Sequence, residues 1–368
     1  MRPRLPQCNL LNLRDAVLAQ DGIRATPKRR VETLVAERFQ RFLVNKNNED
    51  QIERGVEWVE GGQSFENELT IRTHFSSLNY KDALACEGHP GVVRELPQVP
   101  GIDCVGEIVD SKSEKFAPGD KVIVGNASFG TTAPGGWSEW VNVPADWVLP
   151  LPEGLSAEDA IALGTAGFTA AGCVEALLRN GVEPGNGKVL VTGSTGGVGI
   201  FSVMLLAKLG FEVAASTGKR EKELWLKSLG ASEIVSREDM VDESDRPLLK
   251  GAWAGGVDTV GGTTLSTFLR STQIGGAVSA CGVVAGPELP ITVYPFILRG
   301  VSLCGIDSAN TPLEQRKLLW SKLANEWKLD AIGQLTKTVR LDSIESEVQN
   351  ILGGKVAGRV VLDLRDQD

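Results

Sequence analysis

The sequence predicts an α/β protein with a doubly wound parallel sheet and a second domain that is rich in β-strands. The prediction rests on the chain length, on a middle region where short apolar strands alternate with helices, and on an earlier region of short strands and polar turns. At 368 residues the chain is too long for one ordinary core. Its 42% hydrophobic and 23% charged residues are typical of a globular protein.

The β-rich region covers residues 39–156. Phe39–Val44 and Glu68–His74 alternate in polarity, as strands with one buried face do. Val105–Val109 and Lys121–Val124 also have the composition of strands, and polar turns separate them. We expect these strands to form a barrel-like domain.

The middle region, residues 157–308, alternates between strands and helices. We expect strands at Lys188–Thr192, Glu212–Ala215, Glu233–Val235, Val257–Val260, Ala277–Cys281 and Ser302–Gly305, and helices at Ala157–Asn180, Val198–Leu209, Glu221–Leu229 and Leu265–Gln273. This alternation is typical of a parallel sheet that is covered on both faces. Residues 309–368 follow, with helices at Leu313–Trp327 and Ser343–Leu352 and a strand at Arg359–Leu364.

Residues 1–38 differ in composition from the rest of the chain. They carry eight basic and four acidic residues, a local charge of +4 in a chain whose net charge is −9. Organelle-targeting peptides are also rich in arginine but contain fewer acids. We expect a loosely ordered extension before the folded domains.

The bulk properties exclude several classes of protein. A net charge of −9 argues against a general nucleic-acid binder, which carries a basic face. The six cysteines are far apart and form no C-x-x-C pair, so we expect a reducing compartment. No membrane span or signal peptide is apparent. These features favour a cytoplasmic protein without nucleic-acid or membrane partners.

Glycines follow the predicted strand Lys188–Thr192 and open the next helix, in the order Gly193-Ser-Thr-Gly196-Gly197-Val-Gly199. The first glycine lets the chain turn, the next lets a diphosphate approach the backbone, and the last lets helix and strand pack closely. Helix N-terminal N–H groups favour the bound anion. This context predicts a Rossmann-type dinucleotide site, with a purely structural glycine turn as the alternative.

The end of the following strand indicates which dinucleotide binds. NAD sites place an Asp or Glu there to bind the ribose hydroxyls. Here the strand ends Ser216-Thr217-Gly218-Lys219-Arg220, which has hydroxyls and cations but no acid. Such groups form charge-assisted hydrogen bonds with a 2′-phosphate. We predict NADPH; the alternative is that Lys219 and Arg220 are merely solvated.

The sequence predicts no metal. It has two histidines, His74 and His89, and no cysteine cluster with the spacing of metal ligands. His74, at the end of a predicted strand, is better explained as a half-buried histidine than as a ligand. A site assembled from distant Cys, His and Asp residues stays open as an alternative.

The chain resembles the zinc-free quinone-oxidoreductase branch of the medium-chain dehydrogenase/reductase superfamily, and within it the acryloyl-CoA reductase family. The matching segments are Ser76–Asp82, Pro100–Asp103, Gly164–Ala170, Val191–Gly199, Leu226–Ala231 and Pro295–Arg299. The extension before Phe39 has no counterpart. Zinc-dependent relatives carry a cysteine ligand at Leu78 or Asn79 and a Gly-His-Glu at Gly101–Asp103, so these replacements support the metal-free prediction.

The resemblance implies a GroES-like catalytic domain in which residues 309–368 complete what residues 39–156 begin, around a Rossmann NADPH-binding domain at residues 157–308. It also implies a homodimer. The candidate cofactor contacts, from the glycine motif and the resemblance together, are Tyr80, Gly193, Gly196, Gly197, Val198, Gly199, Ile200, Phe201, Ser216, Thr217, Gly218, Lys219, Arg220, Gly261, Gly282, Val283 and Arg359.

By the same resemblance, the reaction is the NADPH-dependent reduction of acryloyl-CoA to propionyl-CoA. Such a reaction needs orientation, a donor for the charge that develops on the thioester oxygen, and a proton source. Tyr80 is the candidate catalytic donor, with a packing role as the alternative. We expect Asn79 and Asp82 to fix the loop that carries Tyr80, and Asp258 to have a structural role.

Other functions stay open at this point. A reductase of quinones or free alkenals would share the cofactor site, and a non-catalytic NADPH-binding sensor is a further alternative. Phe129, Trp137 and Phe296 either line an apolar substrate slot or belong to the core, and the core is the better explanation.

Overall fold

The structure is a computed structural model that describes residues 38–61, 66–330 and 332–365. The predicted extension at residues 1–38 lies outside the described residues, except for Arg38. That residue begins the first strand, β1 (Arg38–Lys46), which pairs antiparallel with β2 (Ile52–Glu60). The two strands form a sheet of their own.

The β1–β2 hairpin is attached to the adjoining domain through the backbone of β1. Phe42 N donates to Trp137 O at 2.9 Å, and Val44 and Gln98 exchange two bonds of 2.8 Å each. The sequence pattern does not predict β2. All of its residues are described and none of them is buried, so pairing with β1 rather than burial accounts for this strand.

The sheet of the β-rich domain combines segments from both ends of the described chain. Its strand order is β14-β15-β3-β4-β5-β7, with β6 paired to β3. The strands are β3 (Leu69–Leu78), β4 (Cys104–Ser111), β5 (Lys121–Val124), β6 (Trp140–Val143), β7 (Val148–Pro150), β14 (Thr336–Val339) and β15 (Arg359–Asp363). Because β15 pairs antiparallel with β3, Val360 lies opposite Leu78.

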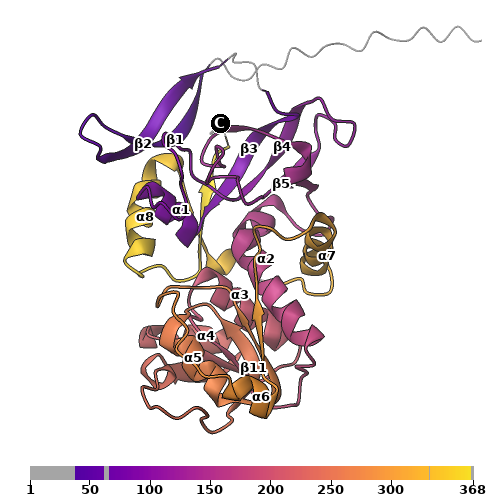
Figure 1. Ribbon diagram of the computed structural model, residues 1–368. Coiled ribbons are helices and arrows are strands. Elements are labelled where there is room, and N and C mark those ends of the chain that lie inside the picture. Colours follow the sequence, from indigo (N-terminus) through magenta and orange to yellow (C-terminus); the bar gives the residue numbers. More distant parts are fainter. Residues whose placement is uncertain (1–37, 62–65, 331, 366–368) are drawn as a thin grey trace, which may run out of the picture. The chain divides into compact units, whose positions relative to one another are not determined.

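The helices that cover this sheet also come from distant parts of the chain. Figure 1 shows α8 (Ile344–Leu352) beside α1 (Tyr80–Cys86), and residues of both helices pack in one core cluster. The buried positions of α8 recur at helical spacing, with Ile344 and Val348 facing Ala83 and Cys86 in that cluster.

The second sheet has the strand order β10-β9-β8-β11-β12-β13, and its pairings are parallel. Its strands are β8 (Val189–Val191), β9 (Val213–Thr217), β10 (Ala231–Ser236), β11 (Trp253–Asp258), β12 (Thr272–Ala280) and β13 (Ser302–Gly305). The connecting helices include α3 (Gly197–Lys208), α4 (Glu223–Ser228), α5 (Gly262–Ser271) and α6 (Tyr294–Arg299). The prediction of a doubly wound parallel sheet is confirmed.

The order of this sheet identifies where a ligand binds. The chain runs outward from β8 to β10 on one side and from β11 to β13 on the other, so the direction reverses between β8 and β11. Doubly wound sheets bind their ligands at the carboxyl ends of the strands at such a switch point.

Helix α2 (Ala157–Arg179) is interrupted at Gly164, which has φ 47° and ψ −150°. Past the interruption, Phe168 stacks on Trp320 of α7 (Leu313–Ala324) with ring centroids 6.0 Å apart. By length and composition α2 could cross a membrane, whereas the sequence analysis found no such stretch. However, 78% of its apolar window is buried inside the fold, and a core helix passes the same test.

Short elements make up most of what the sequence pattern does not predict. Helices α1 and α6 and strands β6, β7 and β14 each have seven residues or fewer. Elements of this length are too short for periodicity to be recognised, and contacts with neighbouring elements stabilise them. The most important difference concerns α1, because its first residue is Tyr80.

Candidate active site

The glycine motif lies at the switch point, between the end of β8 and the start of α3. Gly193 has φ 60°, and a Cβ there would lie 2.3 Å from the Thr259 hydroxyl oxygen. A Cβ on Gly199 would lie 2.3 Å from the carbonyl oxygen of Gly193. These close approaches explain why glycine is needed at both positions.

The N-terminus of α3 suits an anion. Gly196 is its N-cap residue and is exposed, and the first turn of this fully described helix contains no acid. The first N–H groups of a helix have no acceptor within the helix, and the helix dipole favours negative charge there. A diphosphate therefore fits this end of α3.

The predicted contacts differ in what they offer a ligand. The side chains of Ile200 and Phe201 are fully buried in the core, which limits these residues to backbone contacts. Gly197 and Val198 are half-buried. After β12, by contrast, the Val283 side chain is 67% exposed and can contact a ligand.

Close backbone approach and a positive φ explain why glycine is needed after β11 and β12. A Cβ on Gly282 would lie 2.0 Å from Thr259 O, and Gly261 has φ 76°. Gly261 N also donates to Asp258 Oδ2 at 2.7 Å, while Thr192 Oγ1 donates to Asp258 Oδ1 at 2.7 Å. Burial raises the pKa of Asp258, although the hydrogen bonds from these donors lower it in part. Asp258 therefore has the structural role that the sequence analysis expects.

The end of β9 carries the predicted 2′-phosphate site. Ser216 and Thr217 are buried, and Thr217 Oγ1 accepts from Lys219 N at 3.0 Å. Lys219 Nζ donates to Val356 O at 2.5 Å, and burial lowers the pKa of this lysine. Arg220 is exposed. The two predicted cations thus differ: Lys219 is held by the C-terminal segment, and Arg220 is exposed.

The structure adds Arg237, a cation that the sequence analysis did not include. It follows β10, whose last residue Ser236 pairs with Thr217. A Cβ on Gly218 would lie 2.6 Å from the guanidinium carbon of Arg237, so the guanidinium lies against Gly218. Within the described part of the chain, this guanidinium has no hydrogen bond or ion pair. The sequence signal for it is its place just after the next predicted strand, because the carboxyl ends of parallel strands meet at one edge.

Tyr80 is the first residue of α1, and the expectation that it lies in a loop is wrong. Asn79 is the N-cap residue, and its N–H donates to Asp82 Oδ2 at 2.7 Å, as in a capping box. Asp82 Oδ1 accepts from Gly101 N at 3.1 Å and Ile102 N at 2.9 Å. Burial, together with the nearby charge of Asp103, raises the pKa of Asp82 to about 7, although hydrogen bonds from Asn79 and Ile102 oppose the shift. Asn79 and Asp82 thus fix Tyr80, whose side chain is 44% exposed.

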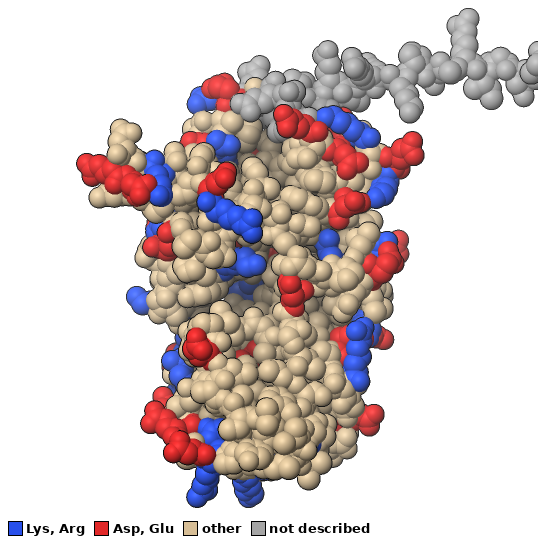
Figure 2. Space-filling view, viewed as in Figure 1, with Lys and Arg blue, Asp and Glu red and all other residues tan. Residues whose placement is uncertain are grey.

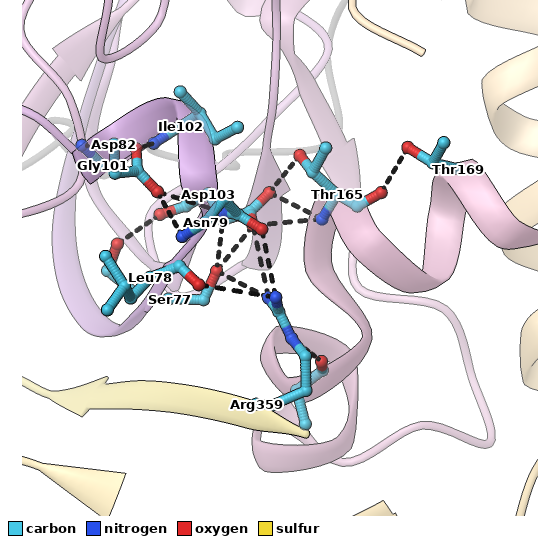
Figure 3. Close-up of polar contacts among 12 residues, drawn as sticks. Ser77, Leu78, Asn79, Asp82, Gly101, Ile102, Asp103, Thr165, Thr169 and Arg359 are labelled. Atoms are coloured by element: carbon cyan, nitrogen blue, oxygen red, sulfur yellow. Dashed lines mark hydrogen bonds and ion pairs between the residues drawn. The ribbon is translucent and has the colours of Figure 1, made fainter. Parts of the chain in front are cut away.

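Next to this N-cap, the buried carboxylate of Asp103 accepts hydrogen bonds from several segments (Figure 3). Ser77 Oγ donates at 2.6 Å, Asn79 Nδ2 at 2.8 Å and Thr165 Oγ1 at 2.6 Å. Arg359 Nη2 lies 4.0 Å from the same carboxylate. The donors come from β3, from the N-cap of α1 and from α2 just past its interruption, and the ion-pair partner Arg359 comes from β15.

Arg359 connects this network with the glycine motif. Its Nη1 donates to Asn79 Oδ1 at 3.1 Å, and a Cβ on Gly197 would lie 3.0 Å from the same nitrogen. The residue before Tyr80 and the start of α3 therefore contact one guanidinium. The structure thereby brings the candidate catalytic residue and the candidate diphosphate site together.

The positions that carry zinc ligands in zinc-dependent relatives belong to this network instead. Asn79 and Asp103 bond to each other and to Ser77, and Ile102 is a buried apolar side chain. Among the described residues, no group of three or more His, Cys, Asp or Glu side chains is placed to hold a metal ion. His74 is half-buried, and burial lowers its pKa.

The aromatic residues considered for a substrate slot are packed in the core. Phe129 and Trp137 are fully buried. Trp137 meets Phe42 edge to face with centroids 5.5 Å apart, and its Nε1 donates to Ser77 O at 3.1 Å. Phe296 packs, partly buried, on the cluster under α5. Core packing accounts for all three.

Comparison with known proteins gives consistent results for both domains. Residues 66–153 match the family model described as "Alcohol dehydrogenase GroES-like domain", and residues 197–325 match the one described as "Zinc-binding dehydrogenase". The β-rich domain and the parallel-sheet domain thus each match a dehydrogenase family model.

Whole-chain relatives are considerably more similar. YhfP of Bacillus subtilis, named as a quinone oxidoreductase, is 43% identical over 89% of this chain and 99% of its own. The acrylyl-CoA reductase AcuI of Ruegeria pomeroyi is 44% identical over 81% of this chain and 90% of its own. The structure of the yhdH oxidoreductase of Salmonella enterica in complex with NADP is 39% identical, with a TM-score of 0.85 over 89% of this chain and 100% of the other.

Proposed function

Because this chain belongs to the zinc-free quinone-oxidoreductase and acrylyl-CoA reductase branch of the medium-chain dehydrogenase/reductase superfamily, we propose that it is an NADPH-dependent reductase of an α,β-unsaturated thioester, converting acryloyl-CoA to propionyl-CoA. The observation that carries the proposal is the contact of Arg359 with both Asn79, next to Tyr80, and the glycine turn at Gly197.

The residues of the chain supply the binding and the orientation. When bound, NADPH supplies the hydride that the β-carbon of the thioester takes up. The N-terminus of α3 holds the diphosphate, and Ser216, Lys219, Arg220 and Arg237 surround the place of the 2′-phosphate. Relatives have been solved with NADPH and, in YhfP, with NAD. The cations and the lack of an acid at residues 216–220 favour NADPH here.

Tyr80 is the proposed catalytic donor. Negative charge develops on the thioester oxygen as the β-carbon accepts hydride, and the α-carbon then takes a proton. The Tyr80 hydroxyl, exposed at the start of a helix fixed by its capping residues, suits both stabilisation of that charge and proton donation. Tyr80→Phe should lower kcat by about 100-fold with little change in the Kd of NADPH. An unchanged rate would end this assignment.

The substrate is tested by comparing acceptors at one NADPH concentration. We expect kcat/KM for acryloyl-CoA to exceed that for crotonaldehyde and for benzoquinone by at least about tenfold, because only the thioester offers the CoA portion for binding. No advantage for the thioester would overturn the substrate proposal. The quinone reductase would then be the better function, as the name of YhfP suggests for that protein.

A non-catalytic NADPH sensor is the remaining alternative. It predicts NADPH binding, seen as a thermal shift, without oxidation by any of these acceptors. The exposed Tyr80, which follows a residue bonded to the same guanidinium that contacts Gly197, favours an enzyme over this alternative. Partners are then small molecules, and the acidic chain favours neither nucleic acid nor a membrane surface.

We also propose that the protein is a homodimer. Strand β13 forms an edge of the parallel sheet, and its residues Ser302–Gly305 carry no charge that would prevent edge pairing. Exposed apolar side chains accompany it, at Leu303 of β13 and at Tyr294, Ile297 and Leu298 of α6. Figure 2 shows few charged side chains around α6 on this face. A second copy that pairs β13 with β13 would cover this surface.

A cytoplasmic location is proposed on chemical grounds. The described cysteines are free thiols, as expected in a reducing compartment. Fractionation of cells that express the full chain tests the location, and recovery in a membrane or secreted fraction would contradict it.

A further inference from the structure

The buried carboxylate of Asp103 connects three separate segments of the chain through hydrogen bonds. Asp103 is 5% exposed, and its carboxylate accepts from Ser77, Asn79 and Thr165. Thr165 contributes its backbone N–H as well, at 2.9 Å, because Gly164 interrupts α2 directly before it. Asp103 thereby caps the second half of α2 and holds the residue before Tyr80 at the same time.

Each nitrogen of the Arg359 guanidinium already donates a hydrogen bond within the protein. It is 4% exposed, and Nε donates to Ala162 O at 2.8 Å. Nη1 donates to Asn79 Oδ1 at 3.1 Å, and Nη2 donates to Ser77 Oγ at 3.0 Å. The neighbouring Asp103 offsets its charge. These bonds fix the guanidinium between β3, the N-cap of α1 and the first half of α2.

The same guanidinium nevertheless touches the glycine motif. Nη1 of Arg359 would lie 3.0 Å, and Cδ 3.4 Å, from a Cβ on Gly197. Immediately before it in the chain, Gly358 N donates to Thr195 O at 3.1 Å. The start of β15 is therefore in contact with the turn on one side and with Asn79 on the other.

We propose that Asp103 and Arg359 are a positioning pair: they set the distance between Tyr80 and the glycine turn, and Arg359 acts through Asn79 and Ser77 rather than as a cofactor ligand. The proposal rests on the proposed catalytic role of Tyr80. It replaces the direct cofactor contact that the family resemblance implies for Arg359. Displacing reacting groups by about 1 Å can cost about 100-fold in rate, so the pair would act mainly on kcat.

Neighbouring serines provide a matched pair of variants. Ser77 Oγ bonds to the Asp103 carboxylate and accepts from Arg359, whereas Ser76 Oγ donates at 2.6 Å only to the Asp103 backbone carbonyl. Both serines are fully buried on β3. Ser77→Ala therefore disturbs the side-chain contacts of the positioning pair. Ser76→Ala removes an equally buried hydrogen bond to the Asp103 backbone and leaves the hydrogen bonds of the Asp103 carboxylate and the Arg359 guanidinium in place.

We expect Ser77→Ala to lower kcat by about tenfold with KM for NADPH within about twofold of the parent. Ser76→Ala should lower the melting temperature about as much as Ser77→Ala does, but leave kcat within about twofold of the parent. In the Tyr80→Phe background, Ser77→Ala should have almost no further effect, because the group that it displaces is already absent. A melting curve of each variant shows that it folds.

Two outcomes would overturn the proposal. One is an equal loss of kcat from Ser76→Ala and Ser77→Ala, and the other is the same loss from Ser77→Ala in the parent and in the Tyr80→Phe background. If the parent reduces only benzoquinone, the proposed thioester function fails, and the coupling between Ser77→Ala and Tyr80→Phe is then measured with that acceptor.

Arg359→Lys gives an independent test of the ligand role. A lysine keeps the charge but loses the planar fork. If Arg359 is a positioning residue, we expect the Arg359→Lys variant to have a lower kcat and a Kd for NADPH within about threefold of the parent. If Arg359 is a direct ligand, the Kd should rise by about tenfold or more. If this variant does not fold, the serine pair still decides the question.

Discussion

The cations at the end of β9 are held in different ways, which determines what their substitution tests. Lys219 is bonded to Val356 O, Arg237 lies against Gly218, and Arg220 is exposed. A hydrogen bond to a charged group contributes about 1.5–3 kcal/mol. If these cations bind the 2′-phosphate as proposed, their removal weakens NADPH binding and leaves NADH binding nearly unchanged.

Lys219→Ala combined with Arg220→Ala should weaken NADPH binding by about 100-fold and NADH binding by less than about threefold, since NADH has no 2′-phosphate. Fluorescence titration with both cofactors measures the two dissociation constants. Arg237→Ala in the same assay shows whether the cation that the sequence analysis missed belongs to the site. Equal losses for both cofactors would remove the 2′-phosphate assignment.

His74 makes the stability depend on pH in a direction that the structure determines. Burial lowers its pKa from 6.5, with Arg72, Arg365 and Lys121 adding to the shift and Glu107 opposing it. The unfolded chain then binds more protons than the folded protein at a pH below about 6.5. Above that pH, His74 is neutral in both states and does not reduce the free energy of unfolding. As the pH falls from about 6.5 toward the pKa of His74 in the folded protein, the free energy of unfolding decreases.

His74→Gln should accordingly reduce the decline in unfolding free energy between about pH 7 and pH 5. His89→Gln serves as the control, because His89 is exposed. Urea denaturation at several pH values gives the slopes, and comparison with the parent cancels the contributions of other groups such as Asp82. Parallel slopes for His74→Gln and the parent would show that His74 is not linked to folding.

At the scale of an element, α2 consists of two helical segments that are separated at Gly164. Gly164 leaves the helical conformation at φ 47°, and Thr165 N then donates to Asp103. A Cβ at Gly164 would lie 2.6 Å from Asp103 Oδ2. The interruption is thus required by the carboxylate that caps the second half of the helix.

Gly164→Ala should lower the free energy of unfolding by more than about 2 kcal/mol, through the strained backbone and the approach to Asp103. Gly172→Ala in the same helix should stay within about 1 kcal/mol of the parent. There the nearest atom to a Cβ is the Ile306 Cγ2 at 3.3 Å, which belongs to a side chain. Chemical denaturation measures both, and similar losses would mean that the interruption carries no special constraint.

At the scale of the molecule, the open question is what covers the β13 edge. Leu298 of α6 is 60% exposed near that edge, and Leu224 of α4 is 81% exposed on the side of the sheet that ends with β10. Leu298→Asp should dissociate the proposed dimer, while Leu224→Asp should not, because only the first adds a charge to the proposed interface. Light scattering during size-exclusion chromatography gives the mass of each species. A monomeric parent would contradict the dimer.

The sequence predicts the parallel sheet with considerable detail. Strands β5 and β13 have the predicted bounds, and the glycine motif begins α3 as expected. Apolar runs and turn residues identify such elements because the relevant side chains are neighbours in the chain. β2 and α1 were not predicted, because partners elsewhere in the fold stabilise them.

What the sequence by itself determined is therefore local: a strand, a glycine turn and a helix that suit a diphosphate, followed by hydroxyls and cations in place of an acid. Only the tertiary structure decided that Tyr80 begins a helix and that Arg237 lies against Gly218. It also decided that Asp103 and Arg359 form an ion pair. The physical reason is that hydrogen bonds and ion pairs between distant segments depend on strand pairing across the sheet, and such partners leave no periodic pattern in the chain.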